Sequence, residues 1–416
     1  MKATTMIAMW VCLTCLGTST AQPARDRNPP GSILIQPPNL QPLNPSNSNL
    51  SNPEGQPTLE QSKRIQLVFC LDVTGSMGGL IATAKQKIWS IASSLLQADP
   101  KPELQIGMVF YRDRGDDFVT KRIDFTSDID SVYGKLMDIS ATGGGDSPES
   151  VNQALFDAVK KFQWYEDSSV YKAVFLVGDC PPHMDYQNDV KYPVTCRDAV
   201  KKGVFINTLK MGNCAGAEQV WREVAMITGG DYIPVDQNAN GYVVTTPYDA
   251  DIARLQNTID NTVVYYGTYT LRMTKDASKS TANKIYKEGK INENASRAEY
   301  KSTKGVTKDV YFKNDLVTDY AKGIVKVDTI RKELLAENLQ TMTIKERTAY
   351  LHKMKAERDT AQAQLQVNMT KRNEYIKTKT ASESDASSNS FSNKVYNTMK
   401  KQTGSKGIVL QGTVKE

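Results

Sequence analysis

The stretch LVFCLDVTGSMGGL (residues 67–80) decides how the first half of this 416-residue chain folds. Its apolar run ends at Asp72, and two hydroxyl residues, Thr74 and Ser76, follow in a glycine-rich turn. A short, continuously apolar run of this kind is typical of a strand that is buried on both faces of a sheet. The question is why such a strand should end in a carboxylate and two hydroxyls.

Similar apolar runs alternate with amphipathic segments up to about residue 266. The runs predict strands at 64–71, 104–111, 121–125, 171–178, 203–211 and 231–235. Helical spacing predicts helices at 80–97, 129–137, 151–162, 217–228 and 249–264, and we expect the last of these to close the unit. This alternation predicts an α/β fold, in which a doubly wound, mostly parallel sheet is covered by helices on both faces.

Ligands of such sheets bind beyond the carboxyl ends of the strands, where Asp72 and Asp179 each follow an apolar run. A phosphate-binding loop would need a lysine after its glycines, and GSMGGL has none. An aspartyl-phosphate enzyme of the haloacid dehalogenase type would need an acid at position 74, which is threonine. A hard divalent cation fits better, because the oxygens of Asp72, Thr74 and Ser76 can converge on one point.

The motif DVTGSM resembles the Asp-x-Ser/Thr-x-Ser signature of von Willebrand factor type A domains, their metal-ion-dependent adhesion site. The segments GLIATAKQKIW, YRDRGDD, GGGDSPE and VGDCPPHMDY are similar to those of exported bacterial proteins of this type. The resemblance covers residues 64–266. It implies a Rossmann-like von Willebrand factor A domain over 63–266, and the helix-forming composition of the remaining chain predicts an α-rich region over 267–416.

The resemblance also implies a set of ligands for Mg²⁺, or else Mn²⁺ or Ca²⁺. Either Thr142 or Asp146 would supply one ligand, and Asp179 would act through water. The remaining ligands would be Asp72, Thr74 and Ser76. In the family, an acidic residue of a partner protein fills the open coordination position, which implies binding and no enzymatic turnover. A metal-dependent phosphoester hydrolase and a structural envelope scaffold are the alternatives.

The N-terminus predicts export. Lys2, a short apolar core and small residues before Ala21 are typical of a signal peptide over 1–21. Residues 22–62 are rich in Pro and Asn and predict a disordered linker. No apolar run reaches the roughly 20 residues that a membrane-spanning helix needs. We therefore expect a secreted or periplasmic protein.

Four cysteines follow the predicted signal peptide, and export favours a disulfide. We expect the pair Cys196–Cys214, with Cys180 as an alternate member, whereas Cys70 lies within a predicted strand. The chain has 2 histidines, so the sequence does not favour acid–base catalysis by histidine. The tripeptide RGD at 114–116 matches an integrin-recognition motif, which short charged loops produce by chance.

The last 150 residues differ from the rest in charge: residues 1–266 carry a net −6 and residues 267–416 a net +12. TYTLRM (268–273) could continue as a strand. Residues 327–379 are helix-forming, but Arg358, Asn368 and Arg372 interrupt their apolar seam, which favours a helical hairpin packed on the main domain over a coiled-coil dimer. A Ser-rich linker is expected near 381–392, and no motif for nucleic-acid binding appears.

Overall fold

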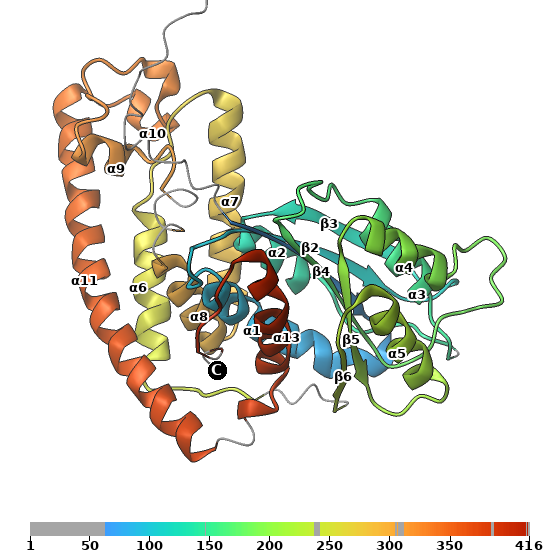
Figure 1. Ribbon diagram of the computed structural model, residues 1–416. Helices are drawn as coiled ribbons and strands as arrows, with labels where there is room; N and C mark the ends of the chain where they lie inside the picture. Colours follow the sequence, from blue (N-terminus) through green and yellow to red (C-terminus); the bar gives the residue numbers. More distant parts are fainter. Residues whose placement is uncertain are drawn as a thin grey trace, which may run out of the picture. The chain divides into compact units, whose positions relative to one another are not determined.

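The computed structural model describes residues 63–145, 147–236, 242–303, 306, 312–383, 387–412 and 414 (Figure 1). These residues all lie in one compact unit that spans Leu59–Glu416. The predicted signal peptide (1–21) and the predicted linker (22–62) lie outside the described residues.

A six-stranded sheet forms the centre of the first half, in the order β3-β2-β1-β4-β5-β6. β3 runs antiparallel to β2, and the other neighbouring strands are parallel. The prediction of a mostly parallel sheet is therefore confirmed. The strands are β1 (Arg64–Asp72), β2 (Glu103–Tyr111), β3 (Thr120–Thr126), β4 (Tyr171–Gly178), β5 (Phe205–Met211) and β6 (Tyr232–Val235).

Helices cover both faces because alternate side chains of each strand point to opposite faces. From β1, Leu67 and Phe69 pack into a core with α1 (Gly78–Leu95) and α2 (Ile129–Met137). The other face carries α3, α4 and α5, and its core includes Val68 and Cys70. These three helices are Val151–Lys160, Tyr192–Lys201 and Ala217–Thr228.

The first face is completed by α13 (Phe391–Thr403), which follows the sheet by more than 150 residues. Val395 and Met399 belong to the same core cluster as the α1 face of β1. Gln402 accepts a hydrogen bond from the hydroxyl of Tyr171 on β4 at 2.6 Å. The expected Ser-rich linker ends in a buried cap of this helix, because Ser390 Oγ accepts from the backbone N–H of Asn393.

The helix that we expected to close the first unit packs elsewhere. α6 (Asp249–Asn261) packs against α8 (Ile291–Ser302) and α11 (Ile344–Ser382), with Ile252 and Leu255 in the shared core. Its place on the sheet is taken by α13, which was not foreseen because the pairing is distant in sequence.

Two further expectations for the C-terminal region are wrong. TYTLRM starts a helix, α7 (Tyr269–Glu288), because Thr268 caps it by accepting a hydrogen bond from Leu271 N–H. The seam of α11 is not interrupted by its arginines, since Arg358 and Arg372 are buried. α11 is one helix of 39 residues that packs on α6 and α9, rather than half of a hairpin. The short helices nearby are α9 (Leu316–Ala321) and α10 (Glu337–Gln340).

Buried ion pairs explain how α11 accommodates these arginines. Arg372 Nε lies 2.9 Å from Asp249 Oδ1, and its Nη1 lies 3.1 Å from Glu299 Oε2. Arg358 donates to Asp315 and to Thr262 O. A buried charge is tolerated only when it is paired, so each arginine fixes α11 to a particular acidic partner.

Candidate functional site

The candidate site lies where the strand order reverses. β1 has β2 on one side and β4 on the other, and the chain builds outward from this pair in both directions. In the register, Asp72 lies beside Tyr111, and Leu71 lies beside Val177. Asp72 and Asp179 therefore follow adjacent parallel strands to the same edge, at the position where open α/β sheets bind ligands.

The structure brings Asp72, Thr74 and Ser76 together. Asp72 is fully buried, and its Oδ1 accepts hydrogen bonds from Thr74 N–H (2.9 Å) and from Thr74 Oγ1 (2.6 Å). Thr74 Oγ1 lies 3.4 Å from Ser76 Oγ. Asp72 Oδ2 is buried and has no hydrogen-bond partner within the described chain. Burial raises the pKa of Asp72, the hydrogen bonds from Thr74 lower it and the nearby carboxylates of Asp179 and Asp116 raise it, so that the pKa is about 7.

Gly178, the last residue of β4, makes room for this carboxylate. A Cβ at this position would lie 2.3 Å from the Tyr111 hydroxyl and 3.1 Å from Asp72 Cβ. The Tyr111 hydroxyl donates to Val177 O at 3.2 Å, so its position is fixed. The small residue at the end of β4 is thus a condition for burying Asp72.

Thr142 approaches the turn through its backbone. Its N–H donates to Val73 O (3.2 Å), and Gly75 N–H donates to Gly143 O (3.0 Å), so the two loops are held side by side. The Thr142 residue itself is exposed. Asp146, the alternative ligand, lies outside the described residues. The choice between these two as ligands stays open.

Glu149 is a site residue that the sequence analysis missed. It is 3% exposed, and its Oε2 has no hydrogen-bond partner among the residues the structure describes. Burial, together with the negative charges of Asp72, Asp113 and Asp179, raises its pKa to about 9. The sequence feature that could have indicated Glu149 is its position in GGGDSPES, the loop of Thr142 and Asp146 just before α3.

A hydrogen-bond network around Asp113 supports the loops next to the site. Asp113 accepts from Ser150 Oγ (2.7 Å) and from Tyr186 OH (2.6 Å), and His183 Nε2 lies 3.3 Å from its Oδ2. His183 Nδ1 also contacts Asp185 Oδ1 at 2.8 Å. Histidine here links two loops at the edge of the sheet.

The RGD tripeptide takes part in the same internal contacts. Arg114 pairs with Asp189 at 2.5 Å and lies over the ring of Tyr186. Asp116 accepts from the N–H groups of Asp113 and Gly144. Both charged side chains of the motif therefore hold the edge loops in place.

The disulfide joins Cys180 and Cys214, with 5.2 Å between their Cα atoms, so the expected pair Cys196–Cys214 is wrong. Cys180 and Cys214 lie in the loops after β4 and β5, which are adjacent parallel strands. Cys196 lies within α4 and is buried as a free thiol, as is Cys70 in β1. Cys180, which we expected as an alternate member of the pair, is the partner of Cys214.

The donor set fits a hard cation with few charged ligands. Asp72 Oδ2 is a buried acceptor without a hydrogen bond from the described chain, and two hydroxyls lie beside its carboxylate. Among the described residues, no three His, Cys, Asp or Glu side chains are grouped to hold a metal ion. The hydroxyls of Thr74 and Ser76 are the groups beside Asp72 that could coordinate a cation together with water.

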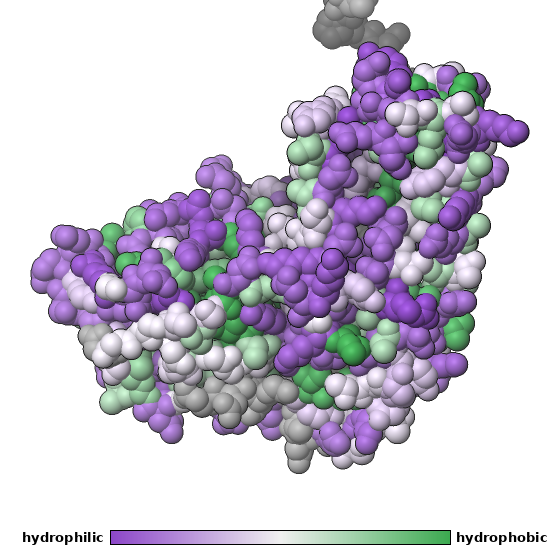
Figure 2. All heavy atoms as spheres, turned by 180° about the vertical axis from the view of Figure 1, so that it is seen from behind, coloured by the Kyte–Doolittle hydropathy of each residue, from purple (hydrophilic) through white to green (hydrophobic). Residues whose placement is uncertain are grey.

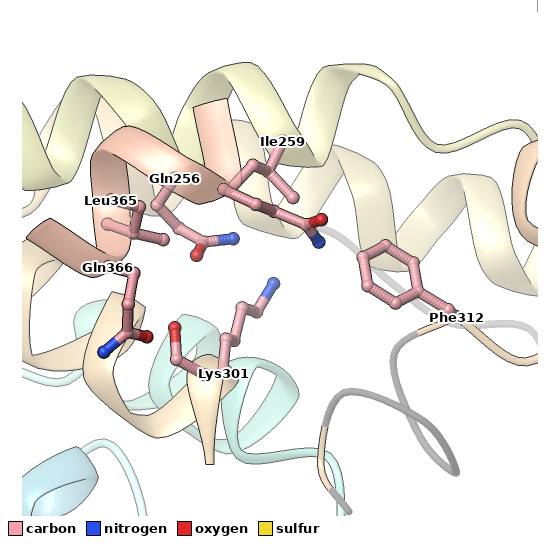
Figure 3. A pocket seen from close by; sticks show the side chains of 8 residues that line it. Gln256, Ile259, Lys301, Phe312, Leu365 and Gln366 are labelled. Atoms are coloured by element: carbon pink, nitrogen blue, oxygen red, sulfur yellow. The ribbon is translucent and has the colours of Figure 1, made fainter. Parts of the chain in front are cut away.

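A pocket lies in the helical region, between α6, α8 and α11 (Figure 3). It has a volume of about 180 Å³, and Lys301 points into it from α8 toward Gln256 of α6. Lys301 Nζ lies 2.8 Å from Asp130 Oδ2 and 3.6 Å from Asp260 Oδ2. Its charge is thus balanced inside the protein, which removes the attraction that an anionic ligand would need.

Figure 2 shows hydrophilic residues over most of the visible face, with hydrophobic residues in small separate groups. None of the described helices is long and apolar enough to cross a membrane.

Comparison with known proteins agrees with this fold. Residues 66–237 match the family model described as von Willebrand factor A domain. Together with the sheet order and the helices on both faces, this match gives the chain a von Willebrand factor A-like fold followed by a helical C-terminal region.

Individual relatives are similar over parts of the chain. The putative ariadne-like RING finger protein R811 of Acanthamoeba polyphaga mimivirus is 31% identical over 123 residues, which are 29% of this chain and 11% of that protein. This chain thus matches about a tenth of the length of that relative. The SpRpn10 VWA domain is 13% identical with a TM-score of 0.33, covering 44% of this chain and 100% of that domain. Proximal thread matrix protein 1 from the mussel byssus is 12% identical with a TM-score of 0.31, covering 42% of this chain and 43% of that one.

Proposed function

We propose that this protein is an exported, divalent-cation-dependent protein-binding module. The observation that carries the proposal is the buried Asp72 carboxylate, which has one oxygen bound by Thr74 and the other without a hydrogen bond from the described chain. A buried carboxylate oxygen without a partner is costly unless the group is protonated or binds a cation. The two hydroxyls beside it favour the cation.

In this proposal, Asp72, Thr74 and Ser76 hold Mg²⁺, or Mn²⁺ or Ca²⁺ in its place, and Asp179 acts through water. When bound, the cation supplies a positive charge at the edge of the sheet, to which an acidic residue of a partner protein binds. The loops of Asp113 and Cys180 are fixed by hydrogen bonds and by the disulfide. A rigid edge lowers the entropy cost of binding a partner.

Binding is favoured over hydrolysis by the hydrogen bonding of Asp113, a candidate general base in the loop after β2. Its carboxylate already accepts hydrogen bonds from Ser150 and Tyr186 and contacts His183. A base that holds three neighbours in place is poorly suited to activating water. The hydrolase alternative would need another base close to the cation.

Export is supported by the disulfide between Cys180 and Cys214, since disulfides persist mainly in oxidising compartments. It agrees with the signal peptide predicted over 1–21. The secreted or periplasmic location and the likeness to exported bacterial proteins remain parts of this proposal.

The test is partner capture by the immobilised protein in Mg²⁺ and in EDTA. We expect one defined protein to be captured in Mg²⁺ and released by EDTA, and Asp72→Ala to lose it. Asp124→Asn is the matched control, because Asp124 lies on β3 with its side chain 72% exposed. Capture of the same partner by Asp72→Ala, or equal capture in EDTA, would contradict the proposal.

A further inference from the structure

We infer that Glu149 is a direct ligand of the cation, a role that the resemblance gave to Thr142 or Asp146. This inference rests on the proposed cation site and adds a second carboxylate to it.

The backbone of Glu149 is tied to the loop that carries Asp179. Glu149 N–H donates to Pro181 O at 2.9 Å, and His183 N–H donates to Glu149 O at 3.1 Å. The bridge between Glu149 and Pro182 is parallel, like an extra pair of residues beyond the end of β4. The start of α3 is therefore fixed against the carboxyl end of the strand next to Asp72.

The side chain of Glu149 lies close to Thr74. A Cβ built on Gly144 would be 3.2 Å from Thr74 Cβ and 3.6 Å from Glu149 Oε1, so both groups surround the same point. Gly144 has a φ of +82°, which favours glycine at this position. A Cβ at position 144 would be tight against Thr74 and in van der Waals contact with Glu149, so glycine leaves the space between the two side chains open.

Two buried carboxylates, Asp72 and Glu149, each keep one oxygen without a hydrogen bond from the described residues. They are 0% and 3% exposed. The described bonds of the nearby Arg112 guanidinium go to Asp117 and Ser140 O, so they do not neutralise either acid. Two buried carboxylates that each keep one oxygen without a hydrogen bond cannot both be charged without a large free-energy penalty, and a bound divalent cation would remove that penalty.

Thr142 is a weaker candidate by the same criteria. It is exposed, and the contact that holds it to the turn is its backbone N–H, which any residue could provide. A second direct carboxylate raises the affinity of an oxygen site for a hard cation, because ligand charge sets the affinity. Glu149 would thus let the protein retain its cation before a partner arrives.

The test is calorimetric titration of the full chain with MgCl₂ and MnCl₂. We expect Glu149→Gln to weaken binding at least about tenfold, which is the scale of losing a group that supports a metal site. Thr142→Val and the exposed control Glu166→Gln should bind within about twofold of wild type. Glu149→Asp, which keeps the charge but shortens the reach, should also bind more weakly.

Folding is checked separately, by circular dichroism and thermal unfolding without cation. Glu149→Gln replaces a buried carboxyl group, whose raised pKa makes it bind a proton when no cation is present, with a neutral amide of similar shape, and should unfold at the same temperature as wild type or a higher one. If wild type binds and Glu149→Gln binds equally well, this inference is overturned while the Asp72 site stands. If wild type binds neither cation, both the inference and the cation dependence of the proposed function are overturned.

Discussion

Thr74 donates two hydrogen bonds to Asp72 Oδ1, one from its N–H and one from its hydroxyl, whereas Asp72 Oδ2 accepts none from the described residues. The turn after β1 thus orients Asp72 without neutralising it. Its second acceptor lies at the switch point between β1 and β4.

The cation-free protein should lose stability as pH rises. The pKa of Glu149 is about 9 in the folded protein against an ordinary 4.5, so the folded state binds the extra proton between these values. The stabilisation that this proton gives the folded state is complete below about pH 4.5 and is lost as pH rises through about 9. Asp72 contributes in the same direction, and its contribution is lost as pH rises through about 7. Chemical unfolding in EDTA at pH 5 and pH 8 measures it.

The matched variant for this measurement is Glu149→Gln, which should unfold with a smaller loss of stability between pH 5 and pH 8. Mg²⁺ should stabilise wild type more at pH 8 than at pH 5, because the cation competes with protons for the same carboxylates. An equal or larger pH dependence in Glu149→Gln would show that Glu149 titrates normally.

The disulfide should stabilise the fold by about 2–4 kcal/mol, the usual range for a bridge that closes a loop of this size. Cys180 and Cys214 are 34 residues apart and join the loops after β4 and β5. Urea unfolding of Cys214→Ser beside wild type should give this difference, and a thiol reductant should lower wild type to the same level. Cys196→Ala is the control: non-reducing peptide mapping should still find the Cys180–Cys214 peptides linked.

Buried arginines of α11 should be more sensitive to substitution than exposed ones. Arg372→Met leaves Asp249 and Glu299 buried beside an apolar side chain, and breaking such a network costs about 3–5 kcal/mol. Arg254→Met is the matched control, because the Arg254 side chain is 58% exposed on α6. Similar unfolding midpoints for the two variants would contradict the role assigned to the buried pairs.

Gly178→Ala should disturb the packing around Asp72. Its Cβ would overlap the Tyr111 hydroxyl, which is buried and hydrogen-bonded, and the overpacking should cost about 1–3 kcal/mol. Cation affinity should fall as well, because Asp72 contacts the same space. Gly404→Ala is the control, since a Cβ there meets nothing within 4 Å. Equal stability and affinity in the two variants would contradict the packing described here.

The sheet could be predicted from the sequence because local signals specify it. Runs such as YKAVFLVG are long enough and apolar enough to be buried strands, and β4 has the predicted bounds. The helix α4 was not predicted, because the buried residues Thr195 and Cys196 do not form a recognisable apolar pattern in the sequence. Its first-turn proline, Pro193, was the available signal.

Features that depend on distant contacts could not be predicted in this way. The cover that α13 provides for the sheet, the pairing of Arg358 with Asp315 and the burial of Glu149 each join residues of different elements. A charged residue in a helix reads as exposed until its partner is known. The disulfide partner of Cys214 likewise depends on strand order rather than on spacing.

The most direct test of the account is the binding of Mg²⁺ and Mn²⁺ to wild type and to Asp72→Asn, measured by calorimetry at pH 8. Asparagine keeps the shape of the side chain and removes its charge, so the fold should persist while cation affinity falls on the order of 100-fold. Asp124→Asn should bind as wild type does. Unchanged affinity in Asp72→Asn, with a folded protein by circular dichroism, would contradict the claim that Asp72 is the centre of a cation site.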